Sequence, residues 1–140
     1  MAGLTNTEMQ LWHAWKQATD TVRTRVAEDI TRATGLSDPD FGVLTRLAEG
    51  GGRLRQNELA TSMNWHRSRL SHHLTRMAQR DLVHREEIGG RVDVLITEQG
   101  RDLVGQARPV HADAVRAHLL RAIPRAQQDQ LCRLLAALGE

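Results

Sequence analysis

This chain of 140 residues contains one cysteine, Cys132, and no tyrosine. One cysteine cannot close an internal disulfide and offers no pair of thiolates for a zinc site, so neither device holds the fold together. The sequence also lacks a run of about 18 apolar residues, and its start lacks the basic-then-apolar layout of a signal peptide. We therefore expect a cytoplasmic protein that does not interact with membranes.

The sequence motifs of common enzymes are missing as well. It contains no glycine-rich phosphate loop, no nucleophile elbow and no paired catalytic carboxylates, and Gly50-Gly51-Gly52 precede a short strand instead of a helix. The length suits one domain, or one protomer of an oligomer, with a real hydrophobic core. These absences favour a binding protein with no catalytic residues, no cofactor and no metal.

Positive charge is concentrated in one segment of the chain. The formal net charge is only +2, yet residues 53–80 contain six arginines and a single glutamate. A local basic patch on a nearly neutral protein indicates a directed contact with a polyanion such as nucleic acid. The competing interpretation of these arginines is an ordinary solvated face.

Hydrophobic periodicity predicts a mainly α fold with a small β-wing. We expect six helices, over residues 7–32, 37–49, 57–63, 66–80, 97–121 and 123–138. A bridging strand is expected at residues 53–55 and a two-strand hairpin at residues 82–96, around Gly89-Gly90. Ser37 and Asn57 are expected to cap their helices, and Asn64 to make a tight left-handed turn. This order predicts a winged helix-turn-helix joined to further helices.

The helix predicted from residue 66 has three distinct faces. On a helical wheel, Leu70, Leu74 and Met77 form a narrow apolar stripe, and one flank carries Arg69, His73, Arg76 and Arg80. The outward face holds small hydrogen-bonding side chains and a histidine, namely Ser68, Ser71, His72, Thr75 and Gln79. Such a helix can enter the major groove of DNA, with side chains at base edges and arginines at phosphates.

These segments resemble the MarR family of bacterial transcriptional regulators. The recognition helix and wing of that family are similar to SRLSHHLTRMAQRDLVHRE followed by RVDVLITEQGR. The typical serine-x-x-serine start of the helix corresponds to Ser68 and Ser71, and the threonine-x-x-glycine motif after the wing corresponds to Thr97 and Gly100. RLRQNELATSM and DFGVLTRLAEGGG resemble its preceding strand and helices. The resemblance implies a homodimer, a repressor in function, that binds a pseudopalindromic operator and is released by a small aromatic or phenolic ligand. It divides the chain into a dimerisation helix (1–36), a DNA-binding region (37–100) and C-terminal dimerisation helices (101–140).

The resemblance also assigns DNA contacts by position. The base-facing residues are expected to be Ser68, Arg69, Ser71 and His72, with Arg67 and His73 beside them. Arg55 and Arg76 are expected at phosphates, and Arg91 at the tip of the wing in the minor groove. Two departures from the family pattern stand out. Gly89 replaces an aspartate that steadies the wing arginine, which predicts a looser tip. His66 replaces the serine or threonine cap of the recognition helix, which predicts a poor cap.

The few aromatic residues raise the question of a ligand pocket. One hypothesis places Trp12, Trp15 and Phe41 at an apolar cavity in which Lys16, Arg46 or His111 fixes a ligand. The alternative is that the tryptophans belong to the core of a dimer.

A metal- or redox-responsive sensor of the same fold is the alternative function. His66, His72 and His73 are unsuited to one ion, because His72 and His73 point about 100° apart on a helix. His111 and His118, with His13 or Asp113, form a second conceivable set, and Cys132 is the only thiol. Solvated histidines are the simpler interpretation. Acidification through about pH 6.5 is expected to charge histidines near DNA and to strengthen binding.

Overall fold

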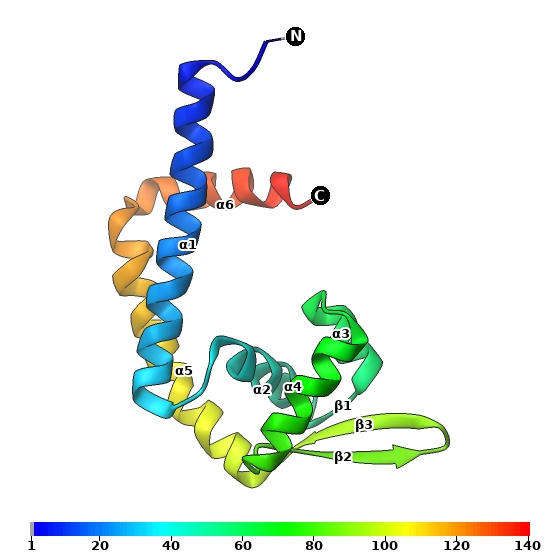
Figure 1. The fold of residues 1–140 in the computed structure, drawn as a ribbon. Coiled ribbons are helices and arrows are strands. Elements are labelled where there is room, and N and C mark those ends of the chain that lie inside the picture. Colours follow the sequence, from blue (N-terminus) through cyan, green and yellow to red (C-terminus); the bar gives the residue numbers. More distant parts are fainter. Residues whose placement is uncertain (1) are drawn as a thin grey trace. The chain divides into compact units, whose positions relative to one another are not determined.

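The secondary structure follows the predicted order (Figure 1). The computed structural model describes residues 2–140. Its six α-helices are α1 (Asn6–Thr34), α2 (Asp38–Glu49), α3 (Gln56–Met63), α4 (Arg67–Gln79), α5 (Glu98–His118) and α6 (Arg125–Leu138), with a short 3-10 helix η1 (Leu120–Ala122). Strands β1 (Arg53–Arg55), β2 (Val83–Ile88) and β3 (Arg91–Ile96) form an antiparallel sheet in the order β1-β3-β2. The mainly α fold with a β-wing is confirmed, and β1 extends the predicted hairpin to three strands.

The chain divides into two compact units. Unit one comprises the residues up to Asp29 together with Val110–Glu140, and unit two comprises Ile30–Pro109. These divisions fall inside α1 and α5, whereas the functional boundaries expected from the sequence fall after residues 36 and 100. The functional boundaries stay a prediction.

The core of unit two is built from the apolar stripes of its helices. The side chains of Leu70, Leu74 and Met77, the predicted stripe of α4, are fully buried. They are buried together with Leu44 and Leu47 of α2, Leu59 of α3 and Val94 of β3. Burial of a leucine-sized side chain contributes about 2 kcal/mol, so this set accounts for much of the stability of the unit. The opposite face of α4 is left exposed.

The first turn of α2 is fixed by a capping box. The Ser37 hydroxyl accepts from the Asp40 amide at 3.1 Å, and the Asp40 carboxylate accepts from the Ser37 amide at 2.9 Å. Two amides that have no partner within the helix are thereby satisfied. Pro39 is tolerated here because an amide in the first turn would have no helical acceptor. Asp40 is only 1% exposed and also pairs with Arg80, the residue that follows α4, at 2.7 Å.

The turn between α3 and α4 confirms one prediction and corrects two. Asn64 has φ 54° and ψ 42°, the expected left-handed conformation. Asn57 is not a cap, because β1 runs directly into α3 and the cap position is Arg55, whose side chain makes no cap hydrogen bond. His66, expected to be a poor cap, does cap α4: its Nδ1 atom accepts from the Ser68 amide at 3.3 Å. A neutral imidazole nitrogen can accept a hydrogen bond as a serine oxygen does.

The wing is a regular hairpin with a tight glycine turn at its tip and a helix cap directly after its second strand. Ile88 pairs with Arg91 across a turn in which Gly89 and Gly90 have φ of 59° and 81°, values suited to a primed turn. At the other end, Thr97 accepts from the amide of Gly100 at 3.0 Å and caps α5. A Cβ atom on Gly100 would collide with the Leu82 carbonyl, which explains the glycine there.

Unit one leaves most of its large apolar side chains exposed. No residue of α6 is buried, and the one buried residue of α1, Ile30, belongs to unit two. A hydrogen bond at 2.8 Å between His118 Nε2 and the Asp29 carboxylate joins α5 to α1. The exposed set comprises Leu4, Met9, Leu11, Trp12, Trp15, Leu119, Leu134, Leu135 and Leu138. Within residues 2–140, no helix is long and apolar enough to cross a bilayer.

We expect Asp40→Ala to lower the free energy of unfolding by about 3 kcal/mol, because it removes a helix cap and a buried ion-pair partner. Urea denaturation measures the loss. The control is Asp38→Ala in the same helical turn, whose exposed side chain should cost less than about 1 kcal/mol. Equal losses for the two variants would show that Asp40 has no special role.

Candidate nucleic-acid interface

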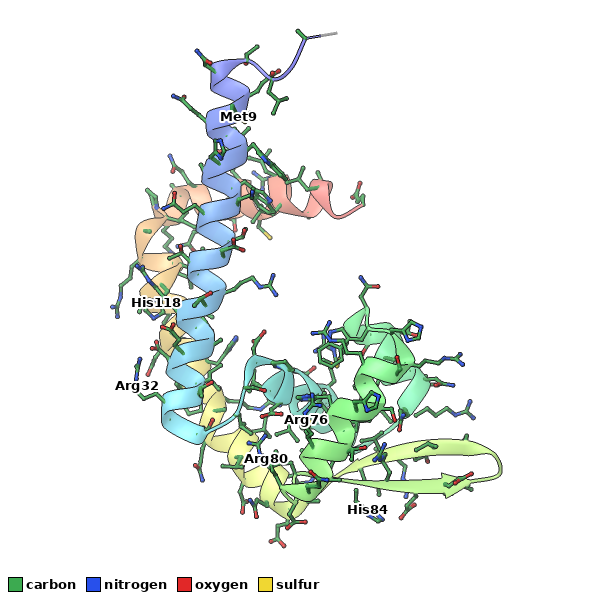
Figure 2. All side chains as sticks on the ribbon, in the orientation of Figure 1. Met9, Arg32, Arg76, Arg80, His84 and His118 are labelled. Atoms are coloured by element: carbon green, nitrogen blue, oxygen red, sulfur yellow. The ribbon has the colours of Figure 1, made fainter. Side chains whose placement is uncertain are left out.

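All nine residues predicted to contact DNA lie in unit two. Arg67, Ser68, Arg69 and His72 are exposed on the first two turns of α4, and Ser71 is half-buried beside them. Arg76 lies one turn further along α4, between these residues and Arg80 (Figure 2). The remaining members are Arg55 at the end of β1, Arg91 at the start of β3, and His73. The structure therefore gathers most of the predicted set on one helix and its wing.

Arg55 and Arg91 are brought together although they are far apart in sequence. Both line a hollow of about 330 Å³ between the first turn of α3 and the wing. The other lining residues are Gln56, Asn57, Glu58, Gly90 and Val92. Two guanidinium groups at one hollow suit an anionic group such as a backbone phosphate.

Two of the six arginines between residues 53 and 80 are neutralised within the protein. Arg53 pairs with Asp93 at 2.7 Å and with Glu86 at 2.9 Å, and Arg80 pairs with Asp40. These carboxylates come from other segments, so the local charge of the sequence overstates the basic surface. The four arginines without an ion pair to a carboxylate in the described residues are Arg55, Arg67, Arg69 and Arg76.

Trp65 provides a platform for one of these arginines. The guanidinium carbon of Arg69 lies 3.8 Å from the centre of the Trp65 ring. Stacking on the ring face uses the flat side of the guanidinium group and leaves its N–H groups, which lie in the plane, free to donate. Arg69 is therefore held in a defined orientation while it keeps its hydrogen-bonding capacity.

His73 requires a correction, because its side chain is not on the DNA-facing surface. It is 9% exposed, and its Nε2 atom lies 2.9 Å from Oδ1 of Asp40. Burial lowers the pKa of His73 from its usual value; Asp40 opposes this effect, and the charges of Arg76 and Arg80 add to it. The helical wheel placed His73 on the cationic flank, and the contact with Asp40 of α2 decides that it points inward. This histidine is consequently not one of those that gain charge readily on acidification.

The wing arginine also requires a correction. Gly89 provides no carboxylate, but Asp93, two residues after Arg91 on the same face of β3, does: Asp93 Oδ1 lies 3.4 Å from Arg91 Nε. The Asp93 side chain is 3% exposed and also binds Arg53. The hydrogen bond from Arg53 lowers the pKa of Asp93, so this carboxylate is charged at neutral pH. The wing arginine thus has a carboxylate partner in Asp93, despite the missing aspartate at position 89.

Arg85 of β2 is a residue that the sequence interpretation missed. Its guanidinium group donates to the Thr75 hydroxyl at 2.8 Å and reaches the Ser71 carbonyl at 3.5 Å. It therefore ties the wing to the outer side of α4, next to the residues expected at base edges. Strand alternation offered the signal, because Arg85 shares a face with the buried Val83.

The residues expected at a ligand pocket are divided between the two units. Trp12, Trp15, Lys16 and His111 belong to unit one, and Phe41 and Arg46 belong to unit two. Within unit one, Trp12 and Trp15 line an apolar hollow with Glu8, Leu11 and Leu138, and Lys16 Nζ lies 5.7 Å from the Trp12 ring centre. In unit two, Arg46 donates to the Gly42 carbonyl at 3.0 Å. A single cavity shared by these residues stays a prediction.

The metal alternative finds no cluster to support it. Among residues 2–140, no group of three or more His, Cys, Asp or Glu side chains is placed to hold an ion. His118, one member of the conceivable set, is instead paired with Asp29. Cys132 is a free, exposed thiol.

Comparison with known proteins identifies the family. Residues 29–98, half of the chain, match the family described as "Domain of unknown function (DUF7343)". No curated protein matches the chain. AbsC, a MarR family transcriptional regulator from Streptomyces coelicolor, is 28% identical with a TM-score of 0.91, and the match covers 99% of this chain and 96% of AbsC. The chain belongs to the DUF7343 domain family and to the MarR family of transcriptional regulators.

Two further solved structures show members of the MarR fold with bound partners. Sco3205, a MarR family regulator from Streptomyces coelicolor solved in complex with DNA, is 28% identical with a TM-score of 0.91, covering 100% of this chain and 90% of Sco3205. The organohalide-sensing regulator RdhR-CbdbA1625 in its 2,4-dichlorophenol-bound form is 19% identical with a TM-score of 0.81, covering 99% and 85%. The second likeness shows the fold alone. Since MarR proteins are regulators and not enzymes, the expectation of a non-enzymatic protein is confirmed.

The burial of His73 predicts how stability depends on pH. Because its pKa is lower in the folded than in the unfolded state, its contribution is complete above about pH 6.5 and is lost as the pH falls toward the folded-state pKa. We expect the free energy of unfolding, measured in urea, to fall between pH 7.5 and pH 5.5. His73→Asn should reduce this slope, whereas His72→Asn, an exposed neighbour, should retain it. An unchanged slope in His73→Asn would contradict the assignment.

Proposed function

We propose that this MarR family chain is a sequence-specific regulator of transcription that binds double-stranded DNA in the cytoplasm as a homodimer on a pseudopalindromic operator. The observation that carries the proposal is the exposed face of α4, where uncompensated arginines flank small hydrogen-bonding side chains. A helix of this composition suits the major groove, with base edges read at its centre and phosphates bound at its margin. The DNA complex of the similar Sco3205 supports the same use of the fold.

Each part of the surface receives a role in this proposal. Ser68, Arg69, Ser71 and His72 read base edges, with Arg67 beside them. Arg55 and Arg76 contact phosphates, and Arg91 enters the minor groove at the wing. Arg85, which joins the wing to α4, holds these two DNA-contacting elements in a fixed position relative to each other.

Dimerisation is proposed from the exposed apolar surface of unit one. Nine of the ten large apolar side chains that stand exposed among the described residues belong to this unit, and Ile88 at the wing is the exception. An apolar surface of this extent marks an interface with a partner. A second copy of the chain fits the palindromic symmetry of the proposed operator, since a twofold dimer presents two equivalent α4 helices.

Repression, with release by a small aromatic or phenolic effector, completes the proposal. The exposed Trp12 and Trp15 and the half-buried Phe41 supply aromatic surface, and Lys16, Arg46 or His111 supplies the polar anchor of the hypothesis. Binding of 2,4-dichlorophenol by a regulator of this fold supports the chemical class. A screen of aromatic acids and phenols for release of bound DNA tests this part separately.

The central experiment is the selection of bound duplexes from a random pool at a fixed salt concentration. We expect enrichment of an inverted repeat whose half-sites lie about one helical turn apart. A pool that shows no enrichment after repeated rounds would refute sequence-specific binding.

The roles on α4 make distinct predictions. Arg76→Ala should weaken binding to selected and random duplexes about equally and reduce the dependence of log K on log salt by about 1. His72→Ala or Ser71→Ala should also relax the preference at one position of each half-site. Fluorescence anisotropy on matched and mismatched duplexes at several salt concentrations separates the two effects. Identical behaviour of all three variants would overturn the assignment of readers.

The dimer proposal predicts that a charge in the apolar surface separates the protomers. Trp15→Glu or Leu135→Glu should shift the sedimentation mass toward the monomer and weaken operator binding at least tenfold, since one α4 helix then binds alone. Gln10→Glu, at an exposed polar position of α1, is the control and should leave the mass unchanged. A monomeric wild-type chain would refute the proposed dimer.

A further inference from the structure

His73 is a buried polar residue in the middle of the proposed recognition helix, and each of its ring nitrogens faces one charged group. Nε2 lies 2.9 Å from Oδ1 of Asp40, at the start of α2. Nδ1 lies 3.3 Å from a terminal nitrogen of Arg76, one turn further along α4. Neither Nε2 nor Asp40 Oδ1 makes a hydrogen bond within the described residues, so the 2.9 Å contact between them is the polar contact that these two buried atoms have.

The chemistry of these neighbours selects one form of the ring. A guanidinium group can only donate hydrogen bonds, so Nδ1 must carry a lone pair to accept from Arg76. The ring hydrogen of the neutral form then sits on Nε2, toward the Asp40 carboxylate. The neutral tautomer with hydrogen on Nε2 therefore suits both neighbours at once, and no other form does.

The ring is held in place from several sides. The Trp65 ring meets His73 edge to face, with centroids 5.7 Å apart and an interplanar angle of 85°. Asp40 is itself fixed by the Ser37 amide at 2.9 Å and by Arg80 at 2.7 Å. Because these contacts come from α2 and from the turn before α4, the direction of the Nδ1 lone pair is set by the fold of unit two.

We propose that neutral His73 is a positioning residue, which holds Arg76 in the orientation that meets a DNA phosphate and releases it when the ring takes up a proton. The proposal rests on the proposed DNA binding and adds its regulation by pH. Arg76 is exposed and has no carboxylate partner among the described residues, so the contact with His73 is the polar contact that orients it.

Protonation would remove the acceptor that Arg76 uses. The added hydrogen occupies Nδ1, so an N–H group faces the guanidinium group where a lone pair stood. The charged groups around the ring act in opposite directions: Asp40 attracts the imidazolium, and Arg76 and Arg80 repel it. Arg80 is held by Asp40, whereas Arg76 has no carboxylate partner among the described residues and is free to swing away. Its contribution to DNA binding therefore declines in acid.

A double-mutant cycle tests whether His73 acts through Arg76. His73→Gln places an amide as far out as Nε2 but nothing at Nδ1, and His73→Asn places an oxygen near Nδ1. We expect His73→Gln to weaken operator binding about fivefold, the effect of one hydrogen bond, and His73→Asn to retain most of the affinity. In an Arg76→Ala background, His73→Gln should have no further effect. An equal loss in both backgrounds would show a merely structural role and overturn the proposal.

A second measurement leaves the buried residue untouched, so it stands even if the His73 variants fold poorly. The ratio of the dissociation constants of Arg76→Ala and the wild type is measured at pH 7.5 and at pH 5.5. We expect this ratio to shrink severalfold in acid, while the ratio for Arg67→Ala, an exposed arginine of the same helix, changes little. A pH effect that is common to all variants cancels in the ratios. A ratio for Arg76 that follows the Arg67 control would overturn the proposal, whereas a wild type that binds no duplex at either pH would refute DNA binding itself.

Discussion

The carboxylate of Asp40 is the interaction on which the DNA-facing unit depends. It closes the capping box of α2, pairs with Arg80 and faces His73, so a single group joins the start of α2 to both halves of α4. A buried carboxylate is tolerable only if it is paired, and here the Ser37 amide and Arg80 donate to Oδ2 while His73 Nε2 lies 2.9 Å from Oδ1. Its pKa is lowered although burial alone would raise it, because hydrogen bonds from Arg80 and Ser37 outweigh desolvation. The orientation of α4, and with it the exposed face of that helix, follows from this contact.

The arginines of unit two fall into two classes that the sequence does not distinguish. Arg53 and Arg80 form ion pairs with buried carboxylates. The arginines without such a partner among the described residues are Arg55, Arg67, Arg69 and Arg76, and their charge is available at the surface. The ion pairs of Arg53 and Arg80 fix the sheet and the end of α4, and these elements hold the other four arginines in position. Since a DNA-binding surface must hold cations close together against their mutual repulsion, ion pairs that fix the sheet and the end of α4 to neighbouring segments are a physical requirement of such a surface.

Local patterns in the sequence predicted the helices, strands and turns well, but they did not predict pairs of residues that are far apart in the sequence. The period of Leu70, Leu74 and Met77 predicted the buried face of α4, and Asn64 and the Gly89-Gly90 pair predicted their turns, because backbone and burial preferences act over a few residues. Arg53 with Asp93 and Arg80 with Asp40 are each 40 residues apart. Helix and strand periodicity relates residues only a few positions apart, so it does not predict such an ion pair. The same limit explains His73, whose inward direction depends on a carboxylate from α2, and Asn57, whose capping role was lost when β1 ran straight into the helix.

The preference of this chain for arginine over lysine has a structural basis in unit two. Arg53 engages two carboxylates with separate nitrogens, at 2.7 and 2.9 Å, and Arg85 joins a hydroxyl and a carbonyl on α4. Arg69 stacks its flat face on Trp65 and keeps its edge free. Each of these arrangements needs a planar group with several donors in fixed directions, and an ammonium group, which is a point charge on a flexible stem, supplies none of them. Replacing these arginines by lysine would keep the net charge and still dismantle both the frame and the orientation of the groups that face DNA.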